Sequence, residues 1–177
     1  MSHADDGELL LSGDHGELAP EPGWAPLQPR GMVGLARSFV SGEPHGNRLR
    51  VVYYEREADR ALVGKAWFGP MAEGPPGHAH GGSMAALLDE AMGCACWLVG
   101  RTVLAKKIEV EFKRPLRLLT TVVIEARLVR SSGRRCYAEG RLTLAGGEEC
   151  ASSTGLFIEL PLERLASLVG SERGPLD

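Results

Sequence analysis

Apolar and polar residues alternate along several stretches of the chain, and this period of two predicts β-strands. The alternation is clearest in 106–113, where Ile108, Val110 and Phe112 fall on one face and charged residues fall on the other. Short turns rich in Gly and Ser separate the later stretches, so these strands are expected to pair antiparallel. The predicted strands cover 48–56, 61–68, 106–113, 120–130, 134–145 and 149–160.

One segment breaks this pattern and predicts a long helix. Between Ser83 and Val99 the only charged residues are Asp89 and Glu90, and most of the others are Ala, Leu, Met, Cys, Trp or Val. A helix that is apolar nearly all round is buried, and at 1.5 Å per residue this one is about 25 Å long. The helix over 82–99 is therefore expected to pack on one face of the sheet, which makes the fold class α+β with one central helix.

Gly and Pro are concentrated at the start of the chain, and their distribution predicts the domain organisation. Residues 1–31 are rich in both and show little periodicity, so they are expected to form a flexible N-terminal tail, with Trp24 and Leu27 as candidate anchors. A single domain is expected over 32–170, closing with a short helix over 161–170, and a C-terminal tail over 171–177. The 177 residues, of which 44% are hydrophobic, suffice for one domain with its own core.

Charge and cysteine usage narrow the class of protein. A net charge of −3 and a pI near 6.0 lack the basic footprint of a nucleic-acid-binding domain. No run of ~18 apolar residues predicts a membrane span, and the N-terminus lacks the positive stretch of a signal peptide. The cysteines show no Cys-x-x-Cys spacing, so they are expected to be reduced core residues. These features predict a cytoplasmic protein without a zinc site.

Asp89 is the first candidate for chemistry, because burying a carboxylate on an apolar helix costs several kcal/mol unless it is paired or hydrogen-bonded. Ala85 and Gly93 lie on the same helical face at i±4 spacing and leave room beside it for a ligand or a second chain. A structural alternative is that Asp89 or Glu90 faces solvent or pairs with an arginine. Glu90 points about 100° away from Asp89 around the helix.

His80-Gly81-Gly82 lies where the Gly- and Pro-rich loop 69–79 becomes helix. Free backbone N–H groups and the positive end of the helix dipole make such a start an oxyanion site, and glycines permit close approach. A plain Gly-rich helix start is the structural alternative. His80 and Asp89 are separated by about 13 Å along one helix, so two antiparallel copies of the helix, and hence a dimer, would bring the two groups to one substrate.

The run from Gly77 through His80-Gly81-Gly82 to Asp89 and Gly93 resembles the signature of hotdog-fold thioesterases, and is similar in particular to their HGG-type, PaaI-like group. The segment 109–115, ending in Arg114-Pro115, resembles the strand that follows the helix in that group. The resemblance covers about 45–160. It implies a hotdog fold, in which an antiparallel sheet of five to six strands wraps around one long central helix.

The resemblance also implies an activity: hydrolysis of acyl-CoA or acyl-carrier-protein thioesters without metal or cofactor, in a homodimer or a homotetramer built as a dimer of dimers. Asp89 corresponds to the general base or nucleophile, and the N–H of Gly81 to the donor that polarises the thioester carbonyl. His80 would orient the loop or contact the carbonyl. The residues expected to line the substrate site are Gly82, Glu90 and Gly93, and the candidates for the CoA phosphates include Lys113 and Arg114.

Two positions depart from the family pattern. Some relatives carry Asn or Gln six residues before the HGG histidine, where this chain has Gly74, and many carry Ser or Thr ten residues before the Arg-Pro proline, where it has Ala105. The missing polar groups favour a second hypothesis, a non-catalytic acyl-CoA or lipid-binding module. A hotdog dehydratase is the third, although no histidine follows Asp89. The sequence leaves the acyl group, the pathway, the oligomer arrangement and the base or nucleophile role of Asp89 open.

Overall fold

The structure is a computed structural model, and it describes residues 18–27, 38–43, 45–161 and 163–164. Its elements follow the predicted order of two strands, one helix and four strands, with one short strand added before them. In chain order they are β1 (Trp24–Pro26), β2 (Leu49–Arg56), β3 (Leu62–Phe68), a 3-10 turn (Pro70–Ala72), α1 (Gly81–Leu98), β4 (Val103–Phe112), β5 (Thr120–Ser132), β6 (Arg135–Thr143) and β7 (Glu149–Glu159).

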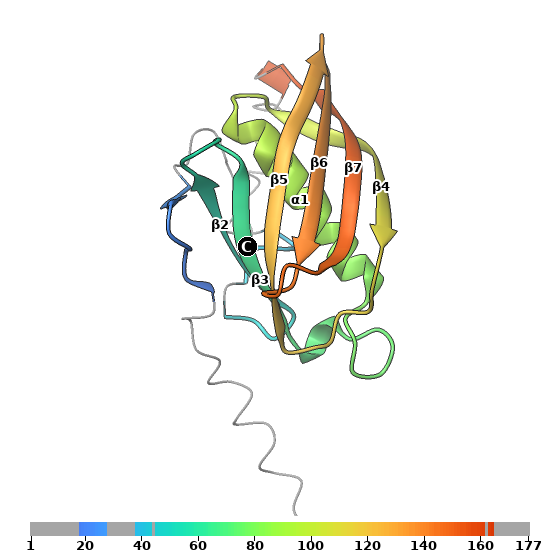
Figure 1. Ribbon diagram of the computed structural model, residues 1–177. Helices are drawn as coiled ribbons and strands as arrows, with labels where there is room; N and C mark the ends of the chain where they lie inside the picture. Colours follow the sequence, from blue (N-terminus) through green and yellow to red (C-terminus); the bar gives the residue numbers. More distant parts are fainter. Residues whose placement is uncertain (1–17, 28–37, 44, 162, 165–177) are drawn as a thin grey trace, which may run out of the picture.

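All strands belong to one sheet, in the order β1-β2-β3-β5-β6-β7-β4, and each pairs antiparallel with its neighbours. The sheet curves around α1, which lies along one of its faces behind β5, β6 and β7 (Figure 1). This is the α+β hotdog architecture that was predicted, with seven strands in the described residues instead of five to six.

The helix is held by its apolar surface and by glycines on the strands beneath it. Leu87, Leu88 and Met92 are fully buried against the sheet, and burial of side chains of this size contributes roughly 1.5–3 kcal/mol each. A Cβ at Gly155 of β7 would lie 3.2 Å from the Met92 side chain and 2.4 Å from the Phe157 ring, so glycine there lets α1 approach the sheet. The helix stops before Gly100, whose φ of +82° is a conformation that favours glycine.

The extra strand comes from the segment that was predicted to be a tail. Residues 24–26 pair with β2, and the Trp24 ring lies 5.9 Å from that of Tyr54, as expected of an anchor. The Tyr54 hydroxyl donates to the carbonyl of Leu18 at 2.8 Å, and Leu18 is buried. Residues 18–27 therefore form part of the folded domain, while the rest of the predicted tail, 1–17 and 28–31, lies outside the described residues.

The strand after the helix, β4, lies at the edge of the sheet and among the described residues pairs only with β7. Its alternation was predicted correctly, because Ile108, Val110 and Phe112 share the face toward α1. Yet Phe112 is 51% exposed, and no residue of β4 after Val103 is buried. Among the described residues, the backbone N–H and C=O groups along the outer edge of β4 therefore pair with no further strand, and partly exposed apolar side chains lie beside them.

The C-terminal end of the predicted domain lies mostly outside the residues that the structure describes. Of the short helix predicted over 161–170, residues 163 and 164 are helical and residues 162 and 165–170 are not described, nor is the tail predicted over 171–177. None of the helices in the described ranges is long and apolar enough to span a membrane.

Candidate active site

The HGG turn is fixed from three sides. The backbone N–H of His80 donates to the carbonyl of Ala72 at 2.7 Å, and that of Ala79 to the carbonyl of Leu116 at 2.8 Å. The His80 side chain is the N-cap of α1, since its Nδ1 accepts from the N–H of Gly82 at 2.8 Å. An accepting Nδ1 assigns the ring proton to Nε2. Of the two roles predicted for His80, the geometry accounts for the orientation of the loop.

The N–H of Gly81 is the free donor of this turn. The next two N–H groups are used, since that of Gly82 binds His80 Nδ1 and that of Ser83 binds the His80 carbonyl at 2.9 Å. The N–H of Gly81 has no acceptor among the described residues. Gly81 packs closely on the end of β4, where an added Cβ would lie 3.3 Å from the Phe112 ring. A free N–H at the start of a helix matches the predicted oxyanion donor.

Asp89 lies two turns further along α1 and is half-buried. Its Oδ1 is buried and has no hydrogen-bond partner among the described residues. Burial, and then the neighbouring Glu90 charge, raise the pKa of Asp89 above its ordinary value. No ion pair between described residues involves Asp89, so the arginine-paired alternative does not apply within this part of the chain. An unpartnered carboxylate with a raised pKa is suited to accept a proton.

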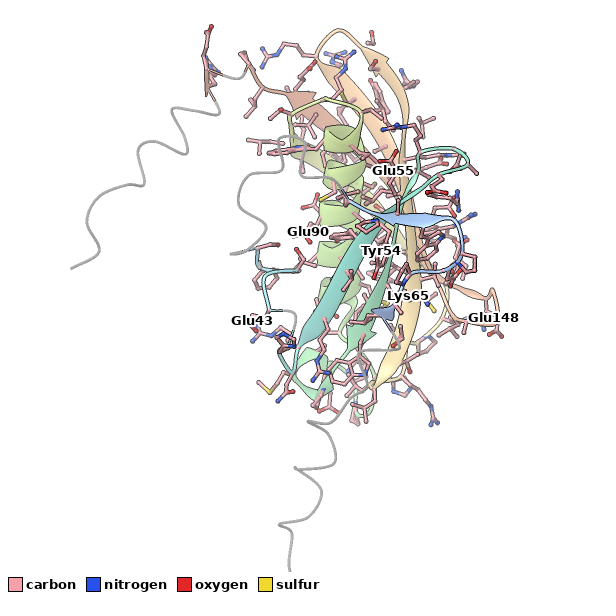
Figure 2. The ribbon with its side chains drawn as sticks, turned by 90° about the vertical axis from the view of Figure 1, so that its left-hand side faces the viewer. Glu43, Tyr54, Glu55, Lys65, Glu90 and Glu148 are labelled. Atoms are coloured by element: carbon pink, nitrogen blue, oxygen red, sulfur yellow. The ribbon has the colours of Figure 1, made fainter. Side chains whose placement is uncertain are left out.

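Glu90 lies where α1, β2 and residues 38–43 meet, as Figure 2 shows. One carboxylate oxygen accepts from the hydroxyl of Tyr53 at 3.0 Å, and the other accepts from the hydroxyl of Ser38. Burial, and then Glu90, raise the pKa of Tyr53 well above its ordinary value. Glu90 was predicted to line the substrate site, whereas in this structure its polar atoms are bonded to two hydroxyls of the same chain.

Within one chain the two unpartnered groups are far apart. Gly81 and Asp89 are separated by eight residues of continuous helix, which is about 12 Å along its axis. A thioester carbonyl that accepts from the Gly81 N–H therefore lies out of reach of Asp89 of the same helix. Between them, the partly exposed side of α1 carries the small residue Ala85 one turn before Asp89.

The remaining predicted residues occupy varied places. Gly82 lies under the His80 ring, because a Cβ there would be 2.9 Å from Nδ1, and Gly93 faces β7, because a Cβ there would be 3.7 Å from the Phe157 ring. Lys113 and Arg114 follow β4 and are engaged by acidic residues: Lys113 with Glu149 at 2.7 Å, and Arg114 with Glu148 at 3.1 Å. Phosphate binding by these two cations would compete with those ion pairs. No three His, Cys, Asp or Glu side chains of the described ranges are grouped as metal ligands.

The two departures from the family pattern have a structural setting. An added Cβ at Gly74 would lie 2.7 Å from the Cα of His80, so this backbone has no room for a polar side chain at that position. Ala105 lies at a bulge of β4, where the register to β7 shifts between Ala105 and Lys107. The nearby Ser83 could supply a polar group in their place, but its hydroxyl already donates to the His80 carbonyl at 2.6 Å.

Sequence reasoning missed three contacts of the site: Phe112 under Gly81, and Tyr53 and Ser38 on Glu90. For Tyr53 a signal existed, because the alternation of 48–56 put it on the inner face with Leu49 and Val51. Ser38 belongs to an irregular segment with no periodicity to place it.

The sequence matches the family described as "Thioesterase superfamily" over residues 76–151, which includes the HGG turn, α1 and β4 to β6. The acyl-coenzyme A thioesterase THEM4 of Bos taurus is 32% identical over 133 residues, which are 75% of this chain and 55% of that protein. The chain thus spans about half the length of this curated relative.

Solved structures agree with the fold. A crystal structure of a thioesterase superfamily protein aligns with a TM-score of 0.59 and 29% identity, over 62% of this chain and 54% of that one. A Bacillus halodurans protein crystallised with CoA aligns with a TM-score of 0.51 and 27% identity, over 55% of this chain and 70% of that one.

Proposed function

This chain belongs to the thioesterase superfamily and has its hotdog fold, and from that premise we propose that it is an acyl-CoA thioesterase, which hydrolyses a thioester to a free acid and CoA. One observation carries the proposal: the N–H of Gly81 and Oδ1 of Asp89 have no partner among the described residues. A buried carboxylate oxygen without a partner is rare, the N–H of Gly81 is one of the donors that a helix start leaves free, and both groups have the polarity that thioester hydrolysis requires.

The chemistry assigns one role to each group. The Gly81 N–H donates to the thioester oxygen and stabilises the negative charge that develops on it. The carboxylate of Asp89 takes a proton from water as the water oxygen bonds to the carbonyl carbon, or attacks that carbon itself and forms an anhydride that water then opens. The C–S bond breaks, and the CoA thiolate receives the proton. His80 keeps the turn in place through its bond to Gly82.

A homodimer would join the two groups in one site. The β4 edge is unpaired in the described residues, and its end at Phe112 contacts Gly81. Antiparallel pairing of two such edges about a two-fold axis would set this end beside the start of the partner's β4 and bring two α1 helices together head to tail. The distance between Gly81 and Asp89 within one chain supports this arrangement.

The substrate class rests on the relatives. The curated relative is named as an acyl-coenzyme A thioesterase, and the Bacillus halodurans protein was crystallised with CoA. Cytoplasmic residence is part of the proposal as well, and it rests on the free thiols of Cys94, Cys96, Cys136 and Cys150.

Release of CoA from a panel of acyl-CoAs, followed with a thiol reagent, tests the activity. The wild type should release CoA, and Asp89→Asn should lose at least about a thousandfold in kcat, since an amide can neither accept the proton nor attack. An Asp89→Asn variant with undiminished turnover would exclude this mechanism. Tight binding of acyl-CoA by the wild type without CoA release would favour the binding module.

Complementation tests the shared site separately. Asp89→Asn and Gly81→Pro are each expected to be inactive, and subunits of the two variants are mixed after reversible dissociation. A site built across two subunits leaves one intact site in each mixed dimer, so a 1:1 mixture should recover about a quarter of wild-type activity. A mixture that contains mixed dimers and stays inactive would show that each site comes from one chain.

A further inference from the structure

Glu90 is the centre of a small polar cluster between three segments that are distant in sequence. Its carboxylate accepts from Tyr53 of β2 at 3.0 Å and from Ser38 of the segment 38–43. The Ser38 oxygen also accepts the N–H groups of Val40 at 3.1 Å and Ser41 at 3.3 Å, so its bonds close a tight turn. We call Ser38, Tyr53 and Glu90 the carboxylate clamp.

We propose that the carboxylate clamp sets the orientation and the charge environment of Asp89, so that Glu90 is a positioning residue for thioester hydrolysis and not a substrate ligand. The inference rests on the proposed function, because it assigns a role toward the reaction of Asp89.

The geometry of the clamp restrains the helix at the residue next to Asp89. Tyr53 is only 8% exposed, and its ring is held between the strands and α1, so its hydroxyl is a fixed donor. Val40, which follows Ser38 closely, is 6% exposed and seats the segment 38–43 on the core. Two fixed donors on one carboxylate define the rotation of α1 about its axis at position 90, and that rotation sets the direction in which Asp89 leaves the helix.

The same bonds occupy both oxygens of Glu90. Each oxygen of this carboxylate already accepts a hydroxyl of the protein, so it has little capacity left to bind a substrate. Breaking these hydrogen bonds would leave the buried Tyr53 hydroxyl without an acceptor. The adjacent carboxylate contrasts with it, because Oδ1 of Asp89 is buried and has no partner in the part of the chain that the structure describes. The two acids therefore have different tasks: one is anchored, and the other is left available.

The clamp also keeps a negative charge beside Asp89. The titratable groups that face it are Tyr53 from β2 and Cys94 from α1, and both are kept neutral, since burial raises the pKa of Cys94 to about 12 and that of Tyr53 well above its usual range. Within the described residues no cation forms an ion pair with Glu90 that would offset its charge. A fixed neighbouring charge makes Asp89 a stronger base near neutral pH.

The experiment measures kcat, KM and the pH dependence of kcat/KM for Glu90→Gln, Tyr53→Phe and the wild type. Glu90→Gln keeps the size of the side chain and can still accept one hydroxyl, but it removes the charge. The acidic limb of its pH profile should move to lower pH by about 0.5 to 1 unit, the effect of one charge roughly 6 Å away at intermediate dielectric. Glu139→Gln, on the outer face of β6 and paired with Arg127, is the matched control and should keep the wild-type limb.

Tyr53→Phe separates anchoring from charge, because it deletes one donor and leaves the sequence of α1 intact. Its kcat should fall about fivefold, the rate equivalent of one hydrogen bond lost from a positioning group, with KM and the acidic limb unchanged. This variant also decides the matter if Glu90→Gln does not fold.

The outcomes separate the two proposals. An acidic limb that does not move in Glu90→Gln, or that moves equally in Glu139→Gln, overturns the positioning role, and so does a Tyr53→Phe variant with wild-type kcat. In each of these cases an inactive Asp89→Asn still upholds the thioesterase proposal. An active Asp89→Asn overturns the thioesterase proposal itself, whatever the clamp variants do.

Discussion

Replacing Gly81 by proline removes the proposed oxyanion donor while leaving the helix start intact. Gly81 is the first residue of α1, directly after the N-cap His80. Proline is favoured at this position because the N–H that it lacks has no partner inside the helix, and its φ near −65° is already helical. The residue before a proline must be extended, and His80 already is, with φ −66° and ψ 134°.

The structure sets the expected magnitudes. The N–H of Gly81 binds no acceptor among the described residues, so no internal hydrogen bond is lost. The new Cβ would meet only the Phe112 ring, at 3.3 Å, and that ring is 51% exposed and can move. Stability should therefore change by less than about 1 kcal/mol. Loss of a single oxyanion donor should lower kcat about 10²- to 10³-fold, or roughly 2.7–4 kcal/mol of transition-state stabilisation.

Gly81→Ala is the matched control, since it adds the same Cβ against Phe112 but keeps the N–H. Both variants are assayed by CoA release under saturating acyl-CoA and by thermal unfolding. The ratio of their kcat values removes the effect of the added Cβ and leaves that of the proline ring closure, which replaces the N–H. The reasoning is refuted if the proline variant unfolds like the alanine variant and its kcat lies within threefold of the alanine value.

Three further predictions concern neighbouring residues. Burial and Glu90 raise the pKa of Asp89, so the ionised carboxyl destabilises the folded state at pH values above the unfolded pKa of about 3.9. Asp89→Asn should therefore raise Tm at pH 7 but not below about pH 4, and an equal gain at both pH values would contradict this. His80→Ala should lower the free energy of unfolding in urea by about 1 kcal/mol because α1 loses its N-cap, whereas His80→Asn should keep most of that stability, since Asn caps well. Equal losses in the two variants would mean that the His80 side chain does not stabilise the protein by capping α1. Gly74→Asn, which restores the polar residue of some relatives, should lower both Tm and kcat/KM, because its Cβ would lie 2.7 Å from the Cα of His80 and would displace the turn. A higher kcat/KM would show that the turn adapts to the side chain.

The sequence by itself determined most of the elements, and it predicted two candidate groups for the site. Alternation of period two placed six strands, including the inward face of β4, and the apolar run around Asp89 and Glu90 placed the helix. These features are local, because the repeat of a strand or helix decides which side chains share a face before any partner is known. The HGG turn and Asp89 could be proposed from the sequence because the motif that resembles the thioesterase family is contiguous in the chain.

Only the tertiary structure decided what each group contacts. Glu90 meets Tyr53 and Ser38, which lie 37 and 52 residues away, and Gly81 meets Phe112 across the sheet edge. Position 74 has no room for a side chain because the loop folds back onto His80, and β4 is open because it ends the strand order. Such contacts arise from how the elements pack, and no periodicity in the chain encodes the partner of a polar atom. For that reason two adjacent acids that look alike in the sequence differ in the fold, one anchored and one unpartnered.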